Sequence, residues 1–76
     1  MLKSERIEIN PDIMLGKPVI KGTRITVELI LRKLGEGATV QEVIQAYSAI
    51  TADDVKAALL YAANTIAHEE HFPVDH

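Results

Sequence analysis

The chain has 76 residues, a formal net charge of -3 and no cysteine. This leaves room for one domain, residues 1–76, and excludes a disulfide scaffold or a thiolate metal site. No stretch is long and apolar enough to span a membrane, and the N-terminus lacks the apolar core of a signal peptide. We therefore expect a cytoplasmic protein. Because so short a chain buries only about 60% of its unfolded surface, we also expect a homodimer.

Charge is distributed unequally along the chain. Residues 1–33 contain seven basic and four acidic side chains, whereas residues 34–76 contain one basic and seven acidic side chains. A polyanion is therefore expected to meet the N-terminal half.

The first expected element is a β-ribbon over residues 5–25. Alternation of charged and apolar side chains from Arg6 to Ile9 predicts a short strand. A turn at Lys21–Gly22 lies between two β-prone runs, which predicts a hairpin of residues 18–20 against residues 23–25. We expect the first strand to join this hairpin, within the chain or across a dimer.

Three helices are expected over residues 26–68, followed by a frayed tail at 69–76. Thr26 can cap the first helix, Thr39 and Glu42 form a capping box before the second, and Thr51 begins the third with aspartates in its first turn. The fold class is therefore α+β and mainly α, with short N-terminal strands before a three-helix bundle of the helix-turn-helix kind, homeodomain-like or winged-helix-like.

The third helix carries two apolar strips. The larger is expected to face the core and contains Val55, Ala58, Leu59, Ala62 and Ile66. The smaller is our candidate contact with a partner subunit or partner protein and contains Ala57, Leu60 and Ala67.

Base reading by the third helix is disfavoured, because Asp53 and Asp54 would face the DNA phosphates. The better DNA-binding candidates are the basic side chains of the hairpin, Lys17, Lys21 and Arg24. Three alternatives stay open for them: protection of a sheet edge, contact with an acidic protein surface, and, for Arg24, an ion pair with a carboxylate such as Glu28 or Asp12.

Metal binding and catalysis find little support in the sequence. The segment His68–His71 places its histidines three apart, whereas the HExxH zinc pattern places them four apart. The predicted folded body has no cysteine, no histidine and no phosphate-binding glycine loop. We therefore expect no catalytic residue, no metal, no cofactor and no small-molecule substrate.

Two motifs carry a resemblance to a known family. GKPVIKGTRITV, from Gly16 to Val27, and ITADDVKAALLYAA, from Ile50 to Ala63, resemble bacterial domain-of-unknown-function family number four hundred and thirty-three. Members of that family are regarded as antitoxin-like and are often encoded beside a small nuclease-like toxin.

The resemblance implies a dimer that binds a cognate toxin, with double-stranded operator DNA left open as a second partner. The alternative is a protein–protein interaction module without DNA binding. Two positions depart from the family pattern: Leu15 replaces a glycine, although leucine disfavours positive φ, and Ser48 replaces a proline.

Overall fold

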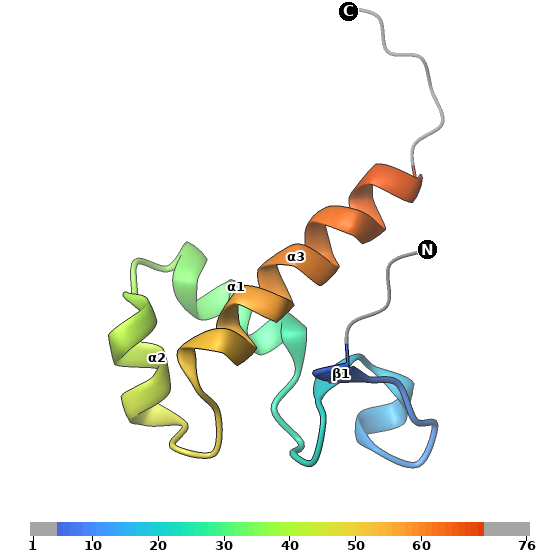
Figure 1. Ribbon diagram of the computed structural model, residues 1–76, viewed down its shortest axis with the longest axis horizontal. Helices are drawn as coiled ribbons and strands as arrows, with labels where there is room; N and C mark the ends of the chain where they lie inside the picture. Colours follow the sequence, from blue (N-terminus) through green and yellow to red (C-terminus); the bar gives the residue numbers. More distant parts are fainter. Residues whose placement is uncertain (1–4, 70–76) are drawn as a thin grey trace, which may run out of the picture.

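Three helices and a two-stranded sheet make up the part of the chain that the structure describes. The structure is a computed structural model that describes residues 5–69. In chain order the elements are β1 (Ile7–Glu8), the 3-10 turn η1 (Met14–Gly16), β2 (Val19–Ile20), α1 (Val27–Gly35), α2 (Val40–Ala46) and α3 (Ala52–Glu69). Helix α3 packs against α1, α2 and β1, and its C-terminal half extends away from the other helices (Figure 1). The predicted α+β, mainly α fold class is confirmed.

The sheet is antiparallel and forms within one chain. Ile7 pairs with Ile20 and Glu8 with Val19, so the first strand joins β2 as expected. The predicted hairpin register is wrong, because Val19 faces Thr26 in an isolated bridge. Thr23 explains the difference: its hydroxyl donates to the Ile20 carbonyl at 2.8 Å and accepts from the Ile25 amide at 2.9 Å. Residue 23 therefore belongs to the turn.

Each of the first two helices begins at a threonine, as predicted. The Thr26 hydroxyl accepts a hydrogen bond from the Leu29 amide at 3.0 Å. Before α2, the Thr39 hydroxyl accepts from the Glu42 amide, and the Glu42 carboxylate accepts from the Thr39 amide. These bonds satisfy amides that have no partner within the helix.

The core lies between the helices and β2. Its buried apolar side chains come from every major element of the described chain except β1: Val19, Ile20, Val27, Ile30, Val43, Ile50, Val55 and Ala58. Ile7 of β1 packs against this cluster from the side.

The prediction for the core-facing side of α3 is only partly right. Val55 and Ala58 are buried, but Leu59 is 44% and Ile66 67% exposed. Helix length explains the exposure of Ile66, which lies in the last turn of α3, because α3 has 18 residues whereas α1 and α2 have nine and seven. At 1.5 Å per residue, the last turns of α3 extend past the helices that could cover them.

The loop before β2 contains an unusual run of left-handed backbone. Met14, Leu15 and Gly16 have φ values of 50°, 61° and 82°. The expectation that a leucine would avoid positive φ at position 15 is therefore wrong. Hydrogen bonds hold the run in place, since the Gly16 amide donates to the Ile13 carbonyl and the Lys17 amide to the Met14 carbonyl. The Leu15 side chain is 93% exposed.

Candidate interaction surfaces

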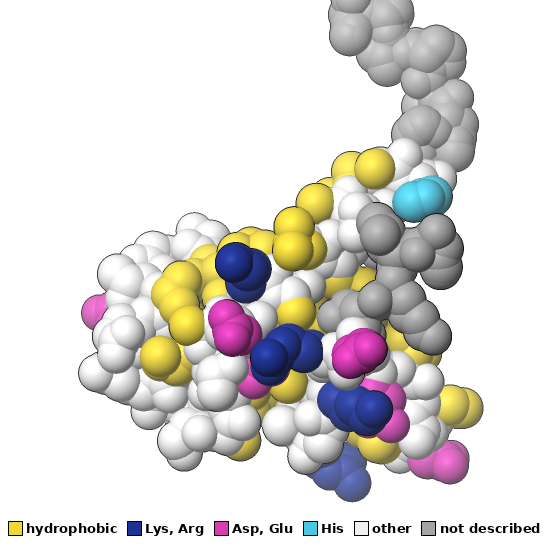
Figure 2. Space-filling model, viewed as in Figure 1, with side chains coloured by type: hydrophobic (Ala, Val, Ile, Leu, Met, Phe, Trp, Pro, Cys, Tyr) yellow, Lys and Arg dark blue, Asp and Glu magenta, His cyan; other side chains and the backbone are white. Residues whose placement is uncertain are grey.

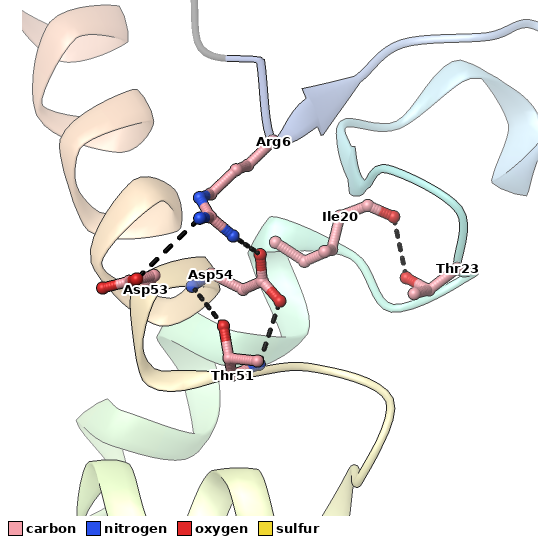
Figure 3. A network of polar contacts seen from close by, with 6 residues as sticks. All are labelled: Arg6, Ile20, Thr23, Thr51, Asp53 and Asp54. Carbon is pink, nitrogen blue, oxygen red and sulfur yellow. Dashed lines mark hydrogen bonds and ion pairs between the residues drawn. The ribbon is translucent and has the colours of Figure 1, made fainter.

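The start of α3 is tied to the segment before β1 by a polar network (Figure 3). The Arg6 guanidinium donates to the Asp54 carboxylate at 3.0 Å and lies 3.8 Å from the Asp53 carboxylate. Asp54 also accepts from the Thr51 amide at 2.9 Å, and the Thr51 hydroxyl accepts from the Asp54 amide at 3.3 Å. Asp54 is therefore turned inward, and its side chain is only 10% exposed.

The Asp54 carboxyl titrates below its ordinary range. Burial on its own would raise the pKa, but the hydrogen bond from the Thr51 amide and the bonds and charge of Arg6 outweigh burial and lower the pKa. The carboxylate is thus charged at neutral pH. Its charge is directed at Arg6 rather than at solvent, which weakens the electrostatic objection to anions at this end of α3.

The three predicted basic residues do not act alike. Lys17 precedes β2 and its ammonium lies 3.0 Å from the Glu28 carboxylate, which Arg32 also contacts at 3.3 Å. The hydrogen bond from Lys17, followed by that from Arg32, lowers the pKa of Glu28. Glu28 is therefore matched with these two cations and not, as one alternative held, with Arg24.

Lys21 and Arg24 lie on the turn at the other end of β2. Both are exposed, and neither side chain has an ion pair with another residue in the range 5–69. An extended backbone rises about 3.3 Å per residue, so roughly 13 Å separates Lys21 from Lys17 along the strand. The structure groups Lys21 with Arg24 and sets Lys17 apart from them.

A row of exposed apolar side chains follows α3. Figure 2 shows hydrophobic side chains in a row from the middle of α3 to its C-terminal end. We name this surface the α3 face and define it by five exposed residues, Leu59, Leu60, Ala63, Ile66 and Ala67. Two residues of the predicted contact strip, Leu60 and Ala67, belong to it. The third, Ala57, is half-buried and lies outside it.

Of the segment His68–His71, considered above as a metal site, the structure describes residues 68 and 69. The His68 ring nitrogen Nδ1 lies 2.8 Å from the Asn64 carbonyl oxygen. Glu69, predicted as the first residue of the tail 69–76, is the last residue of α3. Residues 70–76, which include Glu70 and His71, lie outside the described residues. Between residues 5 and 69, no three histidine, aspartate or glutamate side chains are grouped closely enough to hold a metal ion.

Sequence reasoning missed Arg6 as a structural residue. Its partner Asp54 was placed correctly in the first turn of α3, but the pairing joins positions 48 apart in the chain. The alternation Arg6-Ile7-Glu8 was a usable signal, because Ile7 packs toward the core and leaves its neighbours on the polar side.

Hydropathy tells whether a described helix could cross a membrane. None of the helices in residues 5–69 combines the length and apolar character that a membrane crossing requires.

Comparison with known proteins identifies relatives. The chain is 31% identical over 58 residues to the uncharacterized protein y4eO of Sinorhizobium fredii (strain NBRC 101917 / NGR234), a match that covers 76% of this chain and 26% of that protein. The chain thus spans about a quarter of this curated relative.

A solved structure agrees with the fold. The crystal structure of a DUF433 member protein from Anabaena variabilis ATCC 29413 is 32% identical and superimposes with a TM-score of 0.75, over 78% of this chain and 58% of that one. Residues 7–62 match the family described as protein of unknown function (DUF433). These residues include β1, β2, α1, α2 and the first half of α3, so the chain belongs to the DUF433 family.

Proposed function

We propose that the protein is an antitoxin-like binding module that assembles with another protein chain through the α3 face. The observation that carries this proposal is the exposure of Leu59, Leu60 and Ile66 at 44%, 58% and 67% along one helix. Scattered apolar side chains are normal on a protein surface, whereas a contiguous row commonly marks a binding site. Partner proteins often accept such a row as a helix laid in an apolar groove.

Burial of the α3 face would supply part of the free energy of binding. Fully burying a leucine or isoleucine side chain contributes about 1.5–3 kcal/mol. Covering the exposed parts of these three side chains would therefore contribute about 2.5–5 kcal/mol. Association costs about 4–15 kcal/mol in lost freedom of motion, so contacts beside the α3 face must add to the affinity.

A non-enzymatic role is part of the proposal. The two carboxylates with lowered pKa, Glu28 and Asp54, are paired with cations that stabilise the fold. The ring of His68 lies against the Asn64 carbonyl on an exposed turn of α3. These groups have structural partners, which favours binding over catalysis as the role of the described residues.

The antitoxin-like part of the proposal comes from the family resemblance, which implies a small toxin encoded nearby. The test is co-expression of the tagged chain with the protein encoded beside it, followed by purification of the complex. Leu60→Glu with Ile66→Glu should abolish the complex and restore toxicity. Val40→Glu is the matched control, because Val40 is an exposed apolar residue on α2. Equal recovery with both variants would contradict a role for the α3 face.

Operator DNA is a second candidate partner, favoured by one observation. Lys21 and Arg24 are exposed on the same turn, and Arg6 neutralises the nearby start of α3. Cations available to phosphates give an affinity that falls steeply with salt. Anisotropy of a labelled promoter fragment should therefore show salt-sensitive binding that Lys21→Ala with Arg24→Ala removes. Lys17→Ala is the control, since Lys17 is paired with Glu28. No binding at low salt would exclude this candidate.

A further inference from the structure

We infer that the chain covering the α3 face is a second copy of this protein, with the two α3 helices antiparallel and Ala63 at the twofold axis. This inference rests on the proposed function and deepens it: the chain that covers the α3 face is a second copy, and the protein encoded nearby would bind the dimer so formed, which the same substitutions disrupt. Within the face, Leu60, Ala63 and Ala67 are turned away from the side of α3 that carries the buried Val55 and Ala58, whereas Leu59 and Ile66 follow Val55 on that side and are 44% and 67% exposed. A second helix can therefore approach without displacing the core.

The α3 face is self-complementary in shape. In an antiparallel pair centred on Ala63, each Leu59 lies opposite the other copy's Ala67, and each Leu60 lies opposite Ile66. Large side chains thus meet small ones at one level, and branched side chains meet at the next. Ala63 meets its own copy, and a small residue at the crossing allows the interaxial distance to fall toward about 8 Å.

Charge favours the same arrangement. None of the five residues of the α3 face is charged, so the negative charge of each chain does not oppose close approach there. Exposed Lys56 lies seven residues before Ala63, on the same side of the helix. In the antiparallel pair Lys56 comes level with the C-terminal end of the other α3, where the helix dipole is negative and attracts a cation.

A parallel pair has neither advantage. It would bring the two Lys56 ammonium groups side by side and align the two helix dipoles. It would also set Leu59 against Leu59 and Ala67 against Ala67, which leaves one level crowded and another empty. The antiparallel arrangement is the one in which both shape and charge match.

The first test is the mass in solution, measured by sedimentation equilibrium over a range of concentrations. Wild type should sediment at about twice the chain mass of 8.4 kDa. Leu60→Glu, which places a carboxylate against Ile66, should weaken self-association at least tenfold. Val40→Glu should leave it unchanged. Circular dichroism of each variant checks that the helices remain. A wild type that stays monomeric at the highest concentration would overturn the inference.

The second test uses the absence of cysteine from the chain. Ala63→Cys introduces a single thiol at the proposed axis, where it should form an intermolecular disulfide with its own copy under mild oxidation. Ala67→Cys, an exposed position on the same face, is the matched control: Ala67 meets its own copy only in a parallel pair, so in the antiparallel pair this variant should stay largely monomeric. Cross-linking of Ala63→Cys no faster than that of Ala67→Cys would overturn the antiparallel arrangement.

Failure of this inference is distinguishable from failure of the proposed function. If wild type is monomeric but Leu60→Glu with Ile66→Glu still abolishes the complex with the neighbouring protein, the proposed function stands and the second copy is wrong. If wild type is monomeric, and the complex with the neighbouring protein forms equally well with Leu60→Glu plus Ile66→Glu and with Val40→Glu, then the second copy and the proposed function are both wrong.

Discussion

Arg6 donates a hydrogen bond to Asp54 at 3.0 Å and so joins the segment before β1 to the first turn of α3, 48 positions later. Asp54→Asn removes the charge on the acceptor and weakens the capping of α3. We expect the free energy of unfolding to fall by about 1–3 kcal/mol, because charged hydrogen bonds at a buried site contribute in that range. Urea denaturation at neutral pH measures the change.

Asp53→Asn is the matched control for that substitution. The Asp53 side chain is 72% exposed and lies 3.8 Å from Arg6, so its ion pair is screened by water. The change should stay within about 0.5 kcal/mol. Equal losses in the two variants would mean that general charge at the helix start, rather than the inward position of Asp54, provides the stability.

The stability of the fold should depend on pH through Asp54. Its pKa in the folded protein lies below the ordinary value of 3.8, so at acid pH the unfolded chain binds a proton more readily than the folded one. The stabilisation is complete above about pH 5 and is lost as pH falls through 3.8 toward the folded pKa. The difference in stability between wild type and Asp54→Asn should therefore shrink as pH falls from 5 to 3. A constant difference would contradict this assignment.

Leu15 occupies left-handed backbone with φ of 61° while its side chain is 93% exposed. Such a conformation costs a leucine about 1–2 kcal/mol. Leu15→Gly relieves that cost. It also makes the unfolded chain more flexible, which lowers the free energy of unfolding by about 0.4–1 kcal/mol. The net expectation is a gain of about 0.5–1 kcal/mol, measured by thermal or urea unfolding. A loss of stability would show that the exposed side chain makes a contact that stabilises the fold.

Gly22 and Gly35 should respond oppositely to alanine. Gly22 has φ of +83°, and an added Cβ would meet no atom within 4 Å. Gly22→Ala should therefore cost about 1–2 kcal/mol through backbone strain alone. Gly35 is the last residue of α1 and has equally open surroundings, so Gly35→Ala should be neutral or stabilise by up to about 1 kcal/mol. Loss of stability in both would point to a steric effect. Parallel urea titrations compare them.

Local signals predicted the helices well because each start depends on residues three apart. Thr39 and Glu42 satisfy each other's amides whatever the rest of the chain does, and the same logic placed the start of α3 at Thr51. The hairpin register could not be predicted from such local signals. It depends on whether the Thr23 hydroxyl bonds back to Ile20, and a β-prone threonine does not reveal that in advance.

The α3 face was half predicted. Helical periodicity identified Leu60 and Ala67 as an outer strip but assigned Leu59 and Ile66 to the core. Periodicity reports which residues share a side of a helix and not how far the neighbouring helices reach. The pairings Arg6–Asp54 and Lys17–Glu28 join distant positions, so no local pattern could select them over other combinations of charges.

The distance in sequence between Arg6 and Asp54 also bears on the order of folding. Helix starts held by neighbouring residues can form early, whereas the Arg6–Asp54 contact must wait for a loop of 48 positions to close. Arg6→Met should therefore speed unfolding more than it slows folding, with a φ-value near zero. On this expectation the Arg6–Asp54 contact forms last and breaks first, so it would influence how long the folded state lasts.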